Sequence, residues 1–171
     1  YYSLRYGVLS EKKLLDTFKS LGYDFATLTD INNTSLAMSF INHAKKEQMK
    51  PIIGIDFRNG TKQQFIGLAK TNKGFEFLNR FLSKHLTKDK QFESRAPETN
   101  EAFFIYPWNG KGIPRLRENE YVGIQSNQLS KLKFSKVYNK WKHKLVLLFT
   151  STFRTKKDFN THRLLRAIDN N

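Results

Sequence analysis

The chain has 171 residues, with 30 Lys and Arg against 15 Asp and Glu and no cysteine. The lack of cysteine excludes disulfides, thiolate nucleophiles and cysteine-ligated zinc, and no apolar run approaches the roughly 20 residues that span a membrane. The length and the 39% hydrophobic content suffice for one domain with a substantial core. The formal net charge of +15 leaves two interpretations open, a polyanionic partner such as nucleic acid or a solvated basic surface.

Helices and strands are predicted to alternate along the chain. Apolar residues repeat at helical spacing in four stretches, 11–21, 37–44, 75–82 and 159–168. Short apolar runs predict strands at 25–29, 51–58, 64–69, 103–106, 121–124 and 145–149, the last being the plainest buried strand. Residues 87–99 and 109–119 are expected to be loops, and residues 126–132 a short helix. This alternation predicts an α/β fold with much parallel sheet, closed as a barrel or a barrel-like open sheet.

Local signals mark the ends of several elements. The residues expected to cap helices are Ser10, Thr34, Asn72 and either Ser126 or Asn127. Gly22 is expected to end the first helix. Asn59-Gly60 is a strong hairpin signal between the second and third predicted strands.

Asp30 and Asp56 are the first candidates for a functional site. Each follows a short apolar run, and a predicted helix joins the two runs, which implies parallel neighbouring strands. Because chemistry in barrels and open α/β sheets lies at the carboxyl ends of the strands, we expect the two carboxylates to share one edge. Without a metal they would repel, so a basic residue should lie between them or one pKa should rise.

Several blocks in the same order resemble the PHP (polymerase and histidinol phosphatase) domain family. The blocks are Tyr2-Ser3-Leu4-x-x-Gly7, Leu28-Thr29-Asp30-x-x-Asn33, Lys50-Pro51-Ile52-Ile53-Gly54-x-Asp56, the stretch 66–83, and Asp158 with His162 in the last predicted helix. The likeness is greatest to the PHP domain at the N-terminus of the bacterial DNA polymerase III alpha subunit, and it is weak over residues 84–144. The resemblance implies one distorted TIM-like β/α barrel over residues 1–171, as part of a larger polymerase chain.

The resemblance also implies a site of metal ligands, and this sequence departs from it. Active family members hold zinc or manganese through His, Asp and Glu at strand ends, and some hydrolyse phosphoesters or DNA. The family's Asp-His is Asp30-Ile31 here, its Glu is Asp56, and its late Asp-x-His matches Thr150-Ser151-Thr152. An Ile side chain has no donor atom and a Thr hydroxyl is a poor ligand for these metals. The family's first His-x-His would fall before Tyr1. No cofactor is therefore expected.

Other roles remain open for the polar residues at these positions. Asp30 is predicted to cap the turn that follows it, with a residual cation between Asp30 and Asp56 as the less favoured alternative. None of the histidines has metal-ligand spacing to another, so each is expected to have a surface or packing role. They are His43, His85, His143 and His162.

Two basic stretches are weaker candidates. A basic-aromatic tract suits single-stranded nucleic acid, or else forms a helix exterior with its aromatic residues turned inward; its candidate contacts are Lys131, Lys133, Lys136, Lys140, Trp141 and Lys142, followed by Lys144. Arg115 and Arg117 could grip a phosphate or a carboxylate, although a solvated loop is the favoured interpretation.

These observations favour a non-catalytic PHP domain of a replicative DNA-directed DNA polymerase. Its expected partners are the remainder of the polymerase chain and, in some family members, a separate proofreading exonuclease; DNA would be met through the parent protein, in the cytoplasm and without a membrane. The alternative is a metal-dependent phosphoesterase or 3′–5′ exonuclease, which would require surviving ligands such as Asp56.

Overall fold

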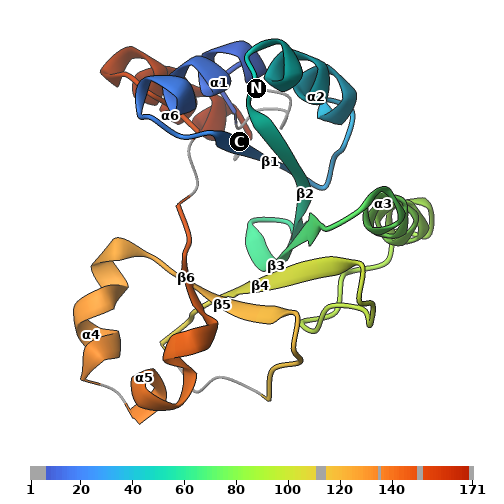
Figure 1. Cartoon of the computed structure of the whole chain (residues 1–171), viewed down its shortest axis with the longest axis vertical. Coiled ribbons are helices and arrows are strands. Elements are labelled where there is room, and N and C mark those ends of the chain that lie inside the picture. The colour runs from blue at the N-terminus through green and yellow to red at the C-terminus, as the bar shows by residue number, and fades with distance from the viewer. Residues whose placement is uncertain (1–6, 111–114, 135, 150–151, 170–171) are drawn as a thin grey trace. The chain divides into compact units, whose positions relative to one another are not determined.

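The computed structural model describes residues 7–110, 115–134, 136–149 and 152–169 (Figure 1). Six strands form one sheet in the order β1-β2-β3-β4-β5-β6, and helices alternate with most of them. The predicted α/β class is confirmed, and the sheet is consistent with part of a PHP-type barrel. The chain divides into two compact units, which we describe separately; one ends at Ile55 and resumes after Phe149, and the other is Asp56–Phe149.

The first unit contains two α-β steps and the last helix. Its elements are α1 (Glu11–Ser20), β1 (Phe25–Ile31), α2 (Ala37–Lys46), the first part of β2 (Lys50–Asn59) and α6 (Lys156–Asp169). As predicted, the Ser10 hydroxyl caps α1 by accepting from the Lys13 amide. Gly22, at φ +78°, ends the helix: its amide bonds the Lys19 carbonyl and the Tyr23 amide bonds that of Phe18.

The second unit contains the rest of the sheet. Its elements are the end of β2, β3 (Lys62–Ala69), α3 (Asn72–Thr87), β4 (Ala102–Pro107), β5 (Glu120–Ile124), η1 (Ser126–Gln128), α4 (Leu129–Lys133), α5 (Lys136–Trp141), η2 (Lys142–Lys144) and β6 (Leu145–Leu147). The predicted hairpin joins β2 and β3, with Gly60 at φ +58°. β3 is antiparallel to β4, whereas β4, β5 and β6 are parallel, so the sheet is less uniformly parallel than predicted.

Aromatic side chains form the core between α3 and the strands. Phe57 of β2 lies 4.9 Å from Phe65 of β3, 5.5 Å from Phe81 of α3 and 5.2 Å from Phe92 between ring centroids. Phe57, Phe65 and Phe104 are fully buried. Tilted and edge-on pairs of this kind stabilise a core beyond their buried area.

Several predictions of the residue that caps a helix were wrong. The N-cap of α3 is Thr71, not Asn72. α2 begins after Leu36, without a side-chain cap, and the Asn33 side chain bonds the Ser35 amide instead. The short helical turn after β5 is capped by Gln125 together with Gln128.

The burial predicted for the last strand and helix was also wrong. β6 is only three residues long, and Leu147 in it and Phe149 beyond it are 62% and 68% exposed. β6 is the last strand in the sheet order, so among the described residues no strand pairs with its outer edge. None of the residues of α6, all of which the structure describes, is buried, and Leu164 and Ile168 are exposed.

Candidate functional site

Asp56 lies in a buried polar cluster on β2. Its carboxylate Oδ2 accepts two hydrogen bonds from Arg58, at 2.9 Å from Nε and 2.6 Å from Nη2. Its Oδ1 accepts one from the amide Nε2 of Gln63, at 2.8 Å. Arg58 is two residues from Asp56 on the same strand, so both side chains lie on one face, and Phe57 between them points to the opposite face. Asp56 does not end the strand as predicted, since β2 continues to Asn59.

The electrostatics of this cluster are those of a closed ion pair. The Asp56 and Arg58 side chains are only 4% and 11% exposed. A carboxylate this deeply buried needs a nearby positive charge and hydrogen-bond donors, and Arg58 supplies both. Arg58 thus lies beside Asp56, whereas a basic residue between Asp56 and Asp30 stays a prediction, because the two carboxylates belong to different units. Three of the roughly four acceptor positions of Asp56 already have donors, and the adjacent Arg58 charge repels a cation.

Asp30 lies on the buried face of β1, with Ala26 and Leu28. Ile31 is half-buried and offers no donor atom. Asp30 belongs to the first unit and Asp56 to the second, so a shared edge and a cation between them stay predictions. The turn after β1 is bonded by Asn33, and a capping role for Asp30 stays a prediction too.

The matches to the late ligand pair add no strong donor. Thr150 lies outside the described residues. Thr152 is half-buried, and its backbone carbonyl accepts a hydrogen bond from the Val8 amide at 3.3 Å. Its side chain offers a neutral hydroxyl, which binds zinc or manganese poorly.

The described residues do not fit the metal cluster that the resemblance implies. Within residues 7–110, 115–134, 136–149 and 152–169, no group of three or more His, Cys, Asp or Glu is placed to hold a metal ion. The histidines lie elsewhere: His85 packs on Phe81 and Phe92, His43 lies 3.4 Å from Glu11, and His143 stacks on Trp141. His162 lies near Phe153. These positions agree with packing or surface roles.

Comparison with known proteins identifies the family. A family model of the PHP domain matches residues 1–112, which is more than half of the 171-residue chain. The chain belongs to the PHP domain family. No curated protein matches it. The matched range ends before the basic-aromatic tract at residues 131–144.

The basic-aromatic tract is divided among α4, α5 and η2. Lys131, Lys133 and Lys142 are exposed, and Trp141 is half-buried; the side chains of Lys136 and Lys140 are outside the described set. Tyr138 packs against a buried cluster of Trp108, Val122, Ile124 and Leu132. The tract therefore has one inward aromatic residue and exposed lysines, an arrangement that both interpretations of the sequence allow.

Lys144 has a structural role that its sequence did not reveal. Its Nζ donates to the backbone carbonyls of Arg117 and Glu118 and lies 4.9 Å from the centre of the Tyr121 ring. These contacts tie η2 to the start of β5. Lys144 is thus engaged within the PHP domain and is a poor candidate for contacting nucleic acid.

A third buried carboxylate, Glu120, was missed by the sequence analysis. It is 1% exposed and receives the Arg117 amide at 2.7 Å, the Tyr106 hydroxyl at 2.8 Å and Arg95 Nη2 at 3.4 Å. Arg117 Nη1 lies 3.3 Å from it, so Arg117 grips a carboxylate of its own chain instead of lying in a solvated loop. Burial, together with Glu120, raises the pKa of Tyr106 and keeps its hydroxyl protonated as the donor.

In the described part of the chain, no helix is long and apolar enough to cross a bilayer.

Proposed function

We propose that this chain is the PHP domain of a replicative DNA-directed DNA polymerase of the DNA polymerase III alpha type, with a structural role in DNA replication and no hydrolytic activity. Membership of the PHP family supports the first part. The blocks at 28–33, 50–56 and 66–83, which are most similar to the polymerase branch of the family, support the polymerase context.

The state of Asp56 is the observation that carries the inactive role. In the family this position supplies a metal ligand, whereas here both carboxylate oxygens accept hydrogen bonds from Arg58 and Gln63. A metal-activated water needs open coordination positions held by several ligands. Arg58 holds a positive charge against the Asp56 carboxylate, where a metal ion would have to bind. The cluster therefore serves to stabilise the fold.

The proposed partners follow from this role. The domain would pack against the remainder of the polymerase chain in the cytoplasm, and a proofreading exonuclease is a further candidate partner. Exposed apolar side chains on α6, Leu164 at 62% and Ile168 at 55%, are suited to such packing. DNA would be bound by the assembled polymerase, whose catalytic carboxylates lie outside this domain.

Hydrolysis of DNA tests the inactive role. The purified chain is incubated with 5′-labelled single-stranded DNA, with and without Mn²⁺, beside the Asp56→Ala variant. We expect no difference between the two proteins at any metal concentration. Mn²⁺-dependent shortening of the DNA that disappears in Asp56→Ala would instead establish the alternative, a metal-dependent phosphoesterase or 3′–5′ exonuclease.

A separate assay tests the polymerase context. Antibodies against this domain would isolate the full-length native protein, which is then given a primed template and deoxynucleoside triphosphates. The proposal predicts primer extension by the isolated protein. If the full-length protein carries no polymerase activity while the domain still lacks hydrolysis, the polymerase context is wrong and the loss of metal chemistry stands.

A further inference from the structure

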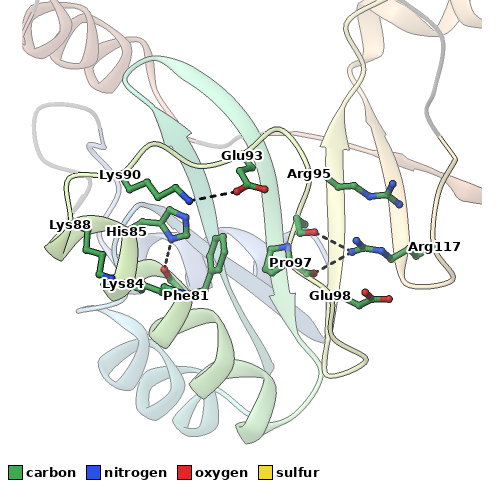
Figure 2. A pocket seen from close by; sticks show the side chains of 11 residues that line it. Phe81, Lys84, His85, Lys88, Lys90, Glu93, Arg95, Pro97, Glu98 and Arg117 are labelled. Atoms are coloured by element: carbon green, nitrogen blue, oxygen red, sulfur yellow. Dashed lines mark hydrogen bonds and ion pairs between the residues drawn. The ribbon is translucent and has the colours of Figure 1, made fainter.

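A second site is suggested by a cavity of about 350 Å³ in the second unit. It lies between the last turns of α3, the loop 88–101 and the start of β5 (Figure 2). This volume is in the range of sites for small ligands. The charged side chains that line it are Lys84, Lys88, Lys90, Arg95, Arg117, Glu93 and Glu98. Five cationic groups face two carboxylates in the lining. The buried Glu120, which contacts both arginines, is a third carboxylate, so the excess is two positive charges.

The two arginines of this cavity are held in place from below. Glu120, which is buried, lies 3.4 Å from Arg95 Nη2 and 3.3 Å from Arg117 Nη1. Arg117 Nη1 also donates to the carbonyls of Ala96 and Pro97, at 3.1 and 3.4 Å (Figure 2). One carboxylate thus serves two guanidinium groups. Because these side chains are already held in position, they lose less conformational entropy when an anion binds than mobile side chains would.

The other wall combines a fixed polar group with a weak ion pair. The Nδ1 atom of His85 lies 2.8 Å from the Phe81 carbonyl (Figure 2). The His85 ring is 6% exposed and stacks on Phe92 at 4.9 Å. Lys90 forms an ion pair with Glu93 at 3.6 Å, and both side chains are largely exposed. An exposed pair of this kind is weak, so a stronger anion can replace Glu93 as the partner of Lys90.

We propose that this cavity binds a phosphate group, either as a free phosphate ion or as part of single-stranded DNA. Guanidinium and ammonium groups are the side chains that bind phosphate oxygens through charge-assisted hydrogen bonds. The carboxyl-terminal end of α3 opposes an anion with about half a negative charge. That is smaller than the excess of two positive charges that remains when Glu120 is counted, so the balance favours an anion. The site is separate from Asp56 and is independent of the polymerase proposal.

The test measures phosphate binding to the whole chain by amide chemical shifts. Inorganic phosphate is titrated at constant ionic strength, with chloride as the reference anion. We expect saturable shifts that centre on His85, Ala96 and Arg117. The Arg95→Ala and Lys88→Ala variants should each weaken binding about tenfold, as expected for the loss of one charge-assisted contact. Lys73→Ala, an exposed lysine in the first turn of the same helix, is the matched control and should bind like the unchanged chain.

A DNA arm distinguishes the two sources of the phosphate group. Fluorescence anisotropy with labelled dT12 is measured with and without competing phosphate. Competition, with weaker binding in Arg95→Ala, assigns the cavity to DNA; phosphate binding without such competition assigns it to the free ion. Phosphate shifts that do not saturate, or that are equal in Arg95→Ala and Lys73→Ala, would overturn the proposal in both forms.

Discussion

Arg58 Nη2 lies 2.6 Å from Asp56 Oδ2, and both side chains are almost fully buried on one face of β2. The pair places a guanidinium group against the carboxylate that, in our proposal, stands at a former metal-ligand position of the PHP family. Gln63 completes the arrangement at the second carboxylate oxygen. Both oxygens of the Asp56 carboxylate therefore accept hydrogen bonds from the same chain. The contribution of these bonds to the stability of the protein can be measured apart from any activity.

Removing Arg58 should destabilise the protein strongly. Arg58→Ala leaves the buried Asp56 carboxylate without its counter-charge, and breaking a buried pair in this way costs about 3–5 kcal/mol of unfolding free energy. Urea unfolding followed by circular dichroism measures it. The control is Arg80→Ala on α3, whose pair with Glu76 is 80% and 59% exposed and should cost less than about 1 kcal/mol. Equal losses in the two variants would contradict the buried-pair account.

Gly74 in the first turn of α3 should not tolerate a side chain. A Cβ atom there would lie 2.0 Å from the backbone oxygen of Glu101, which also accepts from the Lys70 amide at 3.0 Å. Overpacking against backbone outweighs the helical preference of Ala, so Gly74→Ala should lose about 1–2 kcal/mol of unfolding free energy. The neighbouring Lys73→Ala should change it by less than about 0.5 kcal/mol. A Gly74→Ala protein as stable as Lys73→Ala would show that the Glu101 segment moves freely.

The start of α6 should weaken in acid. Thr155 and Asp158 cap it reciprocally: Asp158 Oδ2 accepts from the amides of Thr155 and Arg154, and Thr155 Oγ1 accepts from the Asp158 amide. The backbone hydrogen bond from Thr155 is the main cause that lowers the pKa of Asp158 below its ordinary 3.8. Because the folded pKa is the lower one, this contribution is complete well above pH 3.8 and is lost as the pH falls through the folded value.

The Asp158→Ala variant checks this cap. Its deficit in stability relative to the unchanged chain should be present at pH 6 and should shrink steadily toward pH 2. A deficit that is independent of pH would mean that the charged carboxylate does not contribute.

The exposed lysines of the basic tract give a prediction about DNA. If they contact single-stranded DNA, the affinity should fall steeply with added salt, because each phosphate contact releases counterions. Lys131→Ala with Lys133→Ala should weaken binding of dT12 and flatten the salt dependence by about 1–2 units of slope. Lys45→Ala with Lys46→Ala, on α2 in the other unit, provides the control. If the affinity does not change with salt, or if no binding is seen at low salt, the tract is not a contact surface for DNA.

Local signals in the sequence predicted much of the fold. Ser10 and Gly22 have their predicted effects because the groups that they bond lie within a few residues, and the hairpin forms at Asn59-Gly60 because Gly60 adopts the positive φ that the turn requires. The prediction that residues 145–149 form a buried strand was wrong for the opposite reason. Its composition is apolar, but whether a strand is covered depends on elements far away in the sequence, and β6 has little cover.

The candidate site was predicted in part. That Ile31 cannot bind a metal follows from its hydrocarbon side chain alone and needs no structure. The Asp56–Arg58 contact could have been predicted from the spacing of two in a strand, but the depth of its burial and the role of Gln63 depend on the hairpin. The Glu120 cluster depends on Arg95, which is 25 residues away, and local patterns do not reveal such contacts.

Metal content tests the central claim most directly. The purified chain and Asp56→Ala are incubated with Zn²⁺ or Mn²⁺, dialysed, and measured by inductively coupled plasma mass spectrometry. Because Arg58 and Gln63 already bind Asp56, we predict far less than one ion per chain in both proteins. One or more tightly held ions per chain, lost in Asp56→Ala, would contradict the account.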